Sequence, residues 1–156
     1  MNGEAGAGRL PADAPFKVSA AFEGSTHDIA RARELARTFL GQVRSTHGLR
    51  VSDRASGAVQ LVVSELVTNA FKYAPGPCLL DIELLEGGIQ VTVWDSALDL
   101  PVRREPEPGR VGQHGLEIVT ALSRSFTVHR QSVGKRVVTT VPLVDDPADS
   151  AADRPP

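Results

Sequence analysis

Two neighbouring segments, CLLDIELL at residues 78–85 and GIQVTVWD at residues 88–95, constrain the fold more than any other feature of the sequence. Apolar and polar side chains alternate along both segments, which predicts β-strands that each bury one face. The Glu86-Gly87-Gly88 connection is short and contains glycine, so the two strands are predicted to form an antiparallel hairpin. The chain therefore contains β-sheet whose apolar face has to be covered.

The N-terminal part predicts one further strand and an amphipathic helix. FKVSAAF, residues 16–22, alternates in the same way as the hairpin strands. Ser25 or Thr26 can cap a helix that follows, and Asp28 is favourably placed in its first turn. The apolar residues of this helix recur at helical spacing, at Ile29, Ala32, Ala36, Phe39 and Val43.

A second helix is predicted between the first helix and the hairpin. It begins near Ser52 or Asp53 and runs to about Ala74, where Pro75-Gly76-Pro77 ends it. After the hairpin, residues 96–113 are polar and rich in proline and show neither a helical nor a strand period. A loop of this length usually has a function or is disordered.

The C-terminal part completes the predicted fold of this 156-residue chain. HGLEIVTALSR, residues 114–124, predicts a third helix, and SFTVHRQ and RVVTTVPL predict a closing hairpin with Ser132-Val133-Gly134-Lys135 as its turn. This order favours an α+β fold, a two-layer α/β sandwich with a mixed, mostly antiparallel sheet and helices on one face. Residues 16–144 are predicted to form one domain, with disordered tails at residues 1–15 and 145–156.

Composition and charge exclude several classes of function. Seventeen Lys and Arg against nineteen Asp and Glu give a formal charge of -2, so neither nucleic acid nor a membrane is expected as a direct partner. The single cysteine, Cys78, leaves no internal disulfide and suits a reducing compartment. No apolar run approaches the roughly 20 residues needed to cross a bilayer, and the first residues lack a signal-peptide pattern. A cytoplasmic location is therefore predicted.

The segment SELVTNAFKYAPG, residues 64–76, places polar groups within the predicted second helix. Glu65 and Asn69 are four residues apart and share a helical face, and Lys72 and Tyr73 extend this stripe by another turn. A partly buried carboxylate is costly unless a charged or hydrogen-bonding group meets it, and Asn has poor helix propensity. The two residues at these positions need a physical reason.

A nucleotide with a bound divalent cation supplies one such reason. The amide oxygen of Asn69 is a hard ligand suited to Mg²⁺, and Glu65 could accept a proton from an attacking hydroxyl or water. The alternative is structural: Glu65 faces solvent and Asn69 caps a local kink. These two residues alone do not decide between the two interpretations.

Glycines in the loop supply a second indication of a nucleotide. Gly109, Gly112 and Gly115 recur every third residue directly before the third predicted helix, where free backbone amides and the helix dipole attract phosphate. A glycine-rich turn before a helix more often only permits the turn. The order of features favours a phosphate site at these glycines. A Glu-Asn helix, a hairpin that ends in Asp95 and a long loop precede them.

Three segments in this order resemble the motifs of a known superfamily. ELVTNAFKYA is similar to the asparagine-containing box of the histidine-kinase-like ATP-binding domains, also called the GHKL or Bergerat fold. VWDSALDLP stands where the first glycine box of these domains belongs, and GQHGLEIV resembles the second. The resemblance spans roughly residues 16–143. Within the superfamily, the chain is most similar to the anti-sigma-factor serine/threonine kinases of actinobacteria.

This resemblance implies a role for each matching residue. Asn69 holds Mg²⁺, Glu65 is the general base, and Lys72 lies near the phosphates of ATP. Asp95 accepts the adenine amino group, with Ala97 allowing close approach of the base. The residues implied to surround the phosphates are Gly112, His114, Gly115 and Leu116.

The sequence departs from the superfamily pattern after Asp95. The first glycine box is Asp-x-Gly-x-Gly, whereas Ser96, Ala97, Leu98 and Asp99 follow Asp95 here, so both glycines are missing. Weak or absent nucleotide binding is therefore an alternative.

A second departure lies in the closing hairpin. Arg136 occupies a place where the family often has a small hydroxyl residue. Thr139 and Thr140 follow slightly later, and Thr140 is a candidate for supporting Asp95 in binding adenine.

Several neighbouring residues have simpler explanations. Asp95 could be a turn cap, His114 an exposed loop histidine, and Trp94 a core residue rather than a platform for the base. Three arginines of the loop could meet phosphates but by default form a solvated charged surface: Arg103, Arg104 and Arg110.

Two classes of function follow. The first is a serine/threonine kinase of the anti-sigma-factor type, which phosphorylates a protein antagonist with Mg-ATP and uses Glu65 as the base. The second is a non-catalytic anti-sigma or partner-switching module with weak or lost nucleotide binding. The intact Glu65 favours the kinase, and the missing glycines favour the module. Either class implies a protein partner, a sigma factor or its antagonist, and related kinases often form homodimers.

Overall fold

The computed structural model describes residues 16–73, 76–96 and 113–144. The predicted disordered tails and most of the predicted loop therefore lie outside the described residues. Eight elements follow one another in the described chain: β1 (Phe16–Phe22), α1 (Asp28–Ser45), α2 (Asp53–Tyr73), β2 (Cys78–Leu85), β3 (Gly88–Asp95), α3 (Gln113–Leu122), β4 (Ser125–Arg130) and β5 (Lys135–Pro142).

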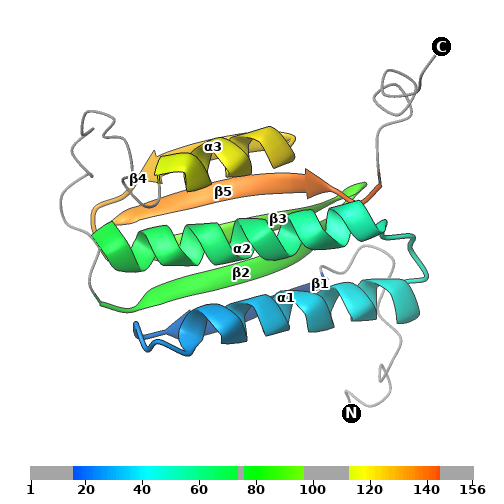
Figure 1. Cartoon of the computed structure of the whole chain (residues 1–156), viewed down its shortest axis with the longest axis horizontal. Coiled ribbons are helices and arrows are strands. Elements are labelled where there is room, and N and C mark those ends of the chain that lie inside the picture. The colour runs from blue at the N-terminus through cyan, green and yellow to red at the C-terminus, as the bar shows by residue number, and fades with distance from the viewer. Residues whose placement is uncertain (1–15, 74–75, 97–112, 145–156) are drawn as a thin grey trace.

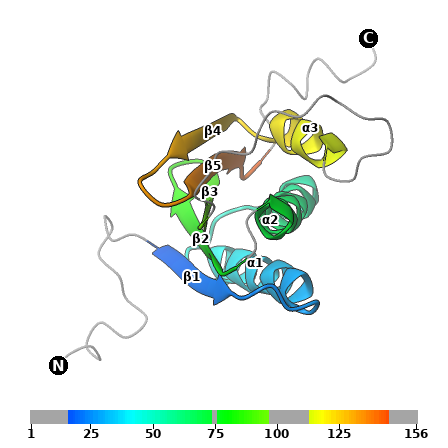
Figure 2. The same ribbon diagram turned by 90° about the vertical axis from the view of Figure 1, so that its left-hand side faces the viewer.

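The five strands form one sheet in the order β1-β2-β3-β5-β4, and the three helices cover one of its faces (Figures 1 and 2). The predicted α+β class, a two-layer sandwich with helices on one face, is confirmed. Each of the described strand pairings is antiparallel, so the sheet contains none of the parallel pairing that a mixed sheet allows. β5 lies between β3 and β4, so the closing hairpin joins the sheet next to β3, the second strand of the first hairpin.

Both predicted hairpins are confirmed. Leu85 pairs with Gly88 across the first turn, and Gly87 adopts a φ of 76°, which glycine reaches without the steric cost of a side chain. The second hairpin differs from its prediction in one respect. Lys135 is the first residue of β5 rather than part of the turn, and it pairs with Asp95 of β3 and Arg130 of β4.

The core lies between the sheet and α2, the central helix. α2 buries residues on several of its sides, and it packs against β2, β3 and β5 as well as against both other helices. At the outer edge of the core, the ring of Phe16 on β1 stacks on that of Phe39 on α1, with centroids 4.7 Å apart. The largest fully buried side chains are Phe39, Leu40, Leu80, Ile82 and Ile89.

The start of α1 differs in detail from its prediction. The helix begins at Asp28, and His27 occupies the N-cap position without a capping side-chain bond. The buried carboxylate of Asp28 instead reaches back, and its Oδ2 accepts hydrogen bonds from the backbone N–H groups of Glu23, Gly24 and Ser25 at 3.0–3.1 Å. Ser25, one of the two predicted caps, accepts a bond from the N–H of His27 through its hydroxyl.

The start of α2 agrees with its prediction. The Oγ of Ser52 accepts a hydrogen bond from the N–H of Ala55 at 3.0 Å, which is the bond expected of an N-cap residue. Among the helices of the described residues, none is long and apolar enough to cross a membrane.

Candidate functional site

The C-terminal half of α2 carries the polar stripe predicted from the sequence. Glu65 and Asn69 are half-buried and lie one helical turn apart, while Val62, Leu66 and Ala70 beside them are buried in the core. Glu65 and Asn69 therefore lie at the margin of the core rather than on the fully solvated side of the helix.

The amide group of Asn69 is the unusual feature of this stripe. Its Oδ1 and Nδ2 atoms are both buried, and neither has a hydrogen-bond partner among the described residues. Buried polar atoms are satisfied in the great majority of cases, because leaving one unpaired costs about 1–3 kcal/mol. An amide held in this way is suited to receive a ligand on its oxygen.

Lys72 extends the stripe toward the end of α2. Its side chain is exposed, and its Nζ lies 5.7 Å from the centre of the ring of Tyr73, the last residue of the helix. The predicted stripe of Glu65, Asn69, Lys72 and Tyr73 is thus present along the last turns of the helix.

The end of α2 lies near the edge of the sheet where β2 begins and β3 ends. Only four residues separate Tyr73 from Cys78, the first residue of β2, and Leu79 pairs with Trp94 beside the end of β3 (Figure 1). Asp95 is buried at this edge. Burial, followed by the negative charges of Asp28 and Asp95, raises the pKa of the Cys78 thiol to about 11.

Asp95 is held by Lys135 of β5. The Nζ of Lys135 donates a hydrogen bond to Oδ2 of Asp95 within an ion pair, and the backbone N–H of Lys135 donates to Oδ1 at 3.3 Å. The side chains are only 3% exposed for Asp95 and 12% for Lys135. The predicted base-reading carboxylate therefore already binds a cation of the chain itself.

Sequence reasoning missed this ion pair because Lys135 was assigned to the turn. Strand alternation carried one residue further back would have placed Lys135 on the same face of β5 as Val137, Thr139 and Val141. That face is the helix-covered one, since Thr139 and Val141 are buried there.

Gly134 fixes the position of Lys135. The glycine has a φ of 74°, and a Cβ added to it would lie 1.8 Å from the carbonyl oxygen of Asp95. Only a residue without a side chain allows the two backbones to approach so closely. The conformation of the turn thus determines where β5 begins opposite Asp95.

The other predicted phosphate-site residues are described only in part. Ala97 and Gly112 lie outside the described residues. His114, Gly115 and Leu116 lie in the first turns of α3, where the structure describes the backbone but not the side chains. The predicted position of this segment at the N-terminal end of a helix agrees with the structure.

The structure separates Thr140 from the other predicted residues. Thr140 pairs with Gln90 on β3, five positions along β5 from Lys135, and strand alternation turns it to the face without helices. Thr139 faces the helices, but its hydroxyl oxygen is engaged there, within hydrogen-bond distance of Ser123 Oγ at 2.5 Å and of the Ser125 carbonyl oxygen at 2.9 Å. Neither threonine lies beside Asp95.

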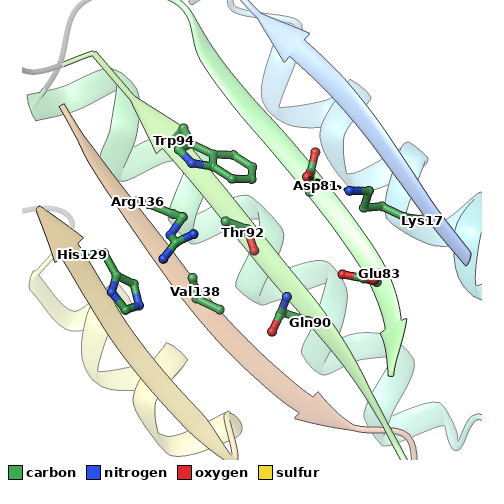
Figure 3. Close-up of a pocket in the computed structure, with 9 residues that line it drawn as sticks. All are labelled: Lys17, Asp81, Glu83, Gln90, Thr92, Trp94, His129, Arg136 and Val138. Atoms are coloured by element: carbon green, nitrogen blue, oxygen red, sulfur yellow. Dashed lines mark ion pairs between the residues drawn. The ribbon is translucent and has the colours of Figure 1, made fainter. Parts of the chain in front are cut away.

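The face of the sheet without helices has a shallow hollow of its own. Trp94, Arg136 and His129 form a row across β3, β5 and β4 at one end of the hollow, and Asp81 and Glu83 of β2 lie across from this row (Figure 3). The hollow has a volume of about 360 Å³. Trp94 is half-buried in its wall, so the expectation of a core tryptophan is not met: strand alternation directs Trp94 and Asp95 to opposite faces.

The fold of this chain also occurs in another protein of known structure. The chain has the fold of a crystal structure of the RsbU and RsbW domains of Rv1364c from Mycobacterium tuberculosis, with a TM-score of 0.61 and 15% sequence identity over 83% of this chain. It spans about a third of that protein, since 33% of the other chain is covered. A histidine kinase domain from Erythrobacter litoralis EL346 is similar at a TM-score of 0.46 and 20% identity, over 72% of this chain and 65% of that one.

A family profile covers most of this chain. No individual curated protein sequence matches the chain. Residues 26–141, however, match the sequence profile of the histidine kinase-like ATPase domain, from the loop before α1 to the penultimate residue of β5. The chain therefore belongs to the histidine kinase-like ATPase domain family.

Proposed function

We propose that this protein binds Mg-ATP and transfers the γ-phosphoryl group to a serine or threonine of a partner protein, as a cytoplasmic kinase of the anti-sigma-factor type. The observation that carries the proposal is the amide of Asn69, buried without a partner among the described residues and placed one turn after Glu65. Membership of an ATPase family and the motif resemblance around residues 64–76 support the choice of nucleotide.

The residues present fit Mg²⁺ bound with a nucleotide. Mg²⁺ takes few protein ligands beside phosphate oxygens and waters, and the unpartnered Oδ1 of Asn69 would hold it. When bound, the ion neutralises negative charge that develops on the phosphates. Lys72 at the end of α2 would add a positive charge, and the backbone of the first turn of α3, with His114, Gly115 and Leu116, would offer amides to the phosphates.

Glu65 would act as the general base. Its carboxylate accepts the proton of the acceptor hydroxyl as that oxygen forms a bond to the γ-phosphorus, and the bond from this phosphorus to the bridging oxygen of ADP breaks. The products are a phosphoserine or phosphothreonine, ADP and a protonated Glu65 that returns its proton to solvent. Glu65 is half-buried on a helix that packs in the core, so the helix fixes the position from which the carboxylate can reach a bound substrate.

The experiment that tests this proposal compares three variants. Asn69→Ala should abolish Mg-dependent ATP binding in a calorimetric titration, whereas Glu65→Gln should retain ATP binding but lower phosphoryl transfer from γ-labelled ATP to the partner by about 10²–10⁴-fold. Gln60→Ala is the matched control. Gln60 lies nine residues before Asn69 on the same helix and bonds Ser56, so its loss should change neither property.

A second candidate function is a non-catalytic module that binds a sigma factor or its antagonist. The ion pair between Lys135 and Asp95 favours it, because this pair engages the carboxylate proposed to read adenine. Partner binding that persists in Glu65→Gln, together with no phosphoryl transfer by the wild-type chain, would establish the module instead. Sedimentation of the free chain and of its complex would show whether either form is a homodimer.

A further inference from the structure

We propose that Lys135 is a built-in competitor of the nucleobase for Asp95, so that the ion pair between them sets the affinity of this protein for ATP. The inference rests on the proposed nucleotide site and goes beyond it, because it assigns to one residue the control of base recognition. Lys135 belongs to none of the sequence motifs that predicted the site.

Lys135 engages both oxygens of the Asp95 carboxylate. Both oxygens of Asp95 accept hydrogen bonds from this single residue, Oδ2 from the ammonium group and Oδ1 from the backbone N–H. Both partners of the Lys135–Asp95 bond are charged, so the Coulomb attraction between two full charges adds to the hydrogen bond. The amino group of adenine is a neutral donor and would have to compete with a charged one.

The ion pair between Lys135 and Asp95 is also buried. The side chain of Asp95 is 3% exposed and that of Lys135 is 12% exposed, so solvent screens the attraction between them only weakly. Moving the ammonium away from Asp95 would separate two buried opposite charges, which is costly unless the lysine makes new contacts. A base that displaces Lys135 therefore has to overcome this cost.

The backbone keeps Lys135 in place. Lys135 is paired in the sheet with Asp95 on one side and Arg130 on the other, and Gly134 before it closes against the Asp95 carbonyl. The Gly134 carbonyl also accepts a hydrogen bond from the N–H of Gln131 at 3.1 Å, which closes the turn. The lysine backbone cannot withdraw without opening the hairpin, so the local concentration of the ammonium at Asp95 stays high.

The consequence is a site with a neutralised base reader. With Lys135 in place, Asp95 contributes little to the choice of base, and the affinity for ATP comes mainly from the phosphates and Mg²⁺. When the lysine side chain is removed, the carboxylate loses its bound cation, and the oxygen that held the ammonium can accept a hydrogen bond from the 6-amino group of adenine. Both affinity for ATP and discrimination by the base should then rise.

The test measures binding of Mg-ATP and of Mg-purine riboside triphosphate, which lacks the 6-amino group, by calorimetry at pH 8. Lys135→Met should bind ATP at least about tenfold more tightly than the wild type. It should also prefer ATP to the analogue, whereas the wild type should bind the two nearly equally. Lys135→Arg keeps the cation and should behave as the wild type.

Lys17→Met is the charge-matched control. Lys17 forms an ion pair with Asp81 on the opposite face of the sheet, with Nζ and Oδ2 3.8 Å apart, so its loss changes the net charge equally and leaves the cation bound to Asp95 in place. This variant should bind ATP no more tightly than the wild type. Thermal unfolding of each variant checks its fold. If Lys135→Met does not fold, Lys135→Gln replaces it, because its amide still satisfies the buried carboxylate, and a smaller gain in the same direction is expected.

The outcomes separate this inference from the proposed function. ATP binding that needs Asn69 but is not tightened by Lys135→Met overturns the competitor role and leaves the nucleotide site standing. An equal gain for ATP and the analogue also overturns the role, since the gain would not involve the amino group. No binding of ATP to either the wild type or Lys135→Met, at millimolar nucleotide, overturns both.

Discussion

Asn69 follows Glu65 by one turn of α2, yet the environments of the two side chains differ. Glu65 is a half-buried acid. Both polar atoms of the Asn69 amide are buried and have no partner in the described part of the chain. A helix interior offers an asparagine no intrinsic benefit. The pair therefore has the pattern of a functional site, in which one residue is held at the expense of stability.

Replacing Asn69 should stabilise the free protein. Asn69→Ala removes two unpaired buried atoms and introduces a better helix former, so we expect the free energy of unfolding to rise by about 1 kcal/mol in the absence of nucleotide. Urea unfolding followed by circular dichroism measures this change. A loss of stability would mean that the amide has a partner in the free protein, and would remove the main support for a ligand there.

The carboxylate of Asp28 should make the stability of the fold depend on pH. Its removal from solvent opposes ionisation, but hydrogen bonds from the Gly24, Ser25 and Glu23 amides and the charge of Arg31 outweigh this and lower the pKa of Asp28. The ionised form is favoured in the folded state, so the stabilisation is complete above the unfolded pKa of about 3.9 and is lost as the pH falls through the lower folded value.

Asp28→Asn tests this contribution. At pH 7 the variant should unfold a few degrees below the wild type, because an amide accepts weaker hydrogen bonds from the three backbone amides. The difference in melting temperature should shrink below about pH 4, where Asp28 of the unfolded chain takes up a proton while the folded carboxylate is still ionised. A difference that stays constant from pH 7 to pH 3 would contradict an ionised role for Asp28.

Two glycines should respond in opposite directions to substitution by alanine. Gly134→Ala places a side chain 1.8 Å from the Asp95 carbonyl at a positive φ and should destabilise the fold by about 2 kcal/mol or more. Gly41→Ala, within α1 and with open space around its Cβ, should stabilise the protein by about 0.5–1 kcal/mol. Chemical denaturation of both variants measures these changes, and a neutral Gly134→Ala would show that the hairpin is free to move away from Asp95.

Cys78 should be inert in the folded protein. Burial and the charges of Asp28 and Asp95 raise the pKa of its thiol to about 11, against about 8.5 in an unfolded chain. At pH 7.5 the thiolate fraction, and with it the rate of labelling by a thiol reagent, should be on the order of 10²–10³-fold lower in the folded state. Rapid labelling without denaturant would contradict the buried position of this residue.

The elements and the fold class could be predicted from the sequence because they depend on local periodicity. The alternation in residues 78–85 and 88–95, and the apolar helix that ends before Pro75, each reflect the environment of one element, and the sheet follows from packing their apolar faces. The cap of α1 was harder to predict. Ser25 and Thr26 are the caps that the sequence suggests. Asp28 accepts hydrogen bonds from the Gly24 and Ser25 amides only because the loop before α1 turns back toward its carboxylate.

The candidate site, too, could be predicted only in part from the sequence. Glu65 and Asn69 could be paired from the sequence, because a spacing of four residues fixes a shared helical face whatever surrounds the helix. That both polar atoms of Asn69 are buried and unpartnered, that Thr140 and Trp94 face away from the helices, and that Lys135 binds Asp95 were decided by the tertiary structure. Asp95 and Lys135 are forty residues apart, and only the pairing of β3 with β5 brings the ammonium to the carboxylate. Local periodicity specifies which way a side chain points along its own element, whereas the partner it meets depends on how distant elements pack.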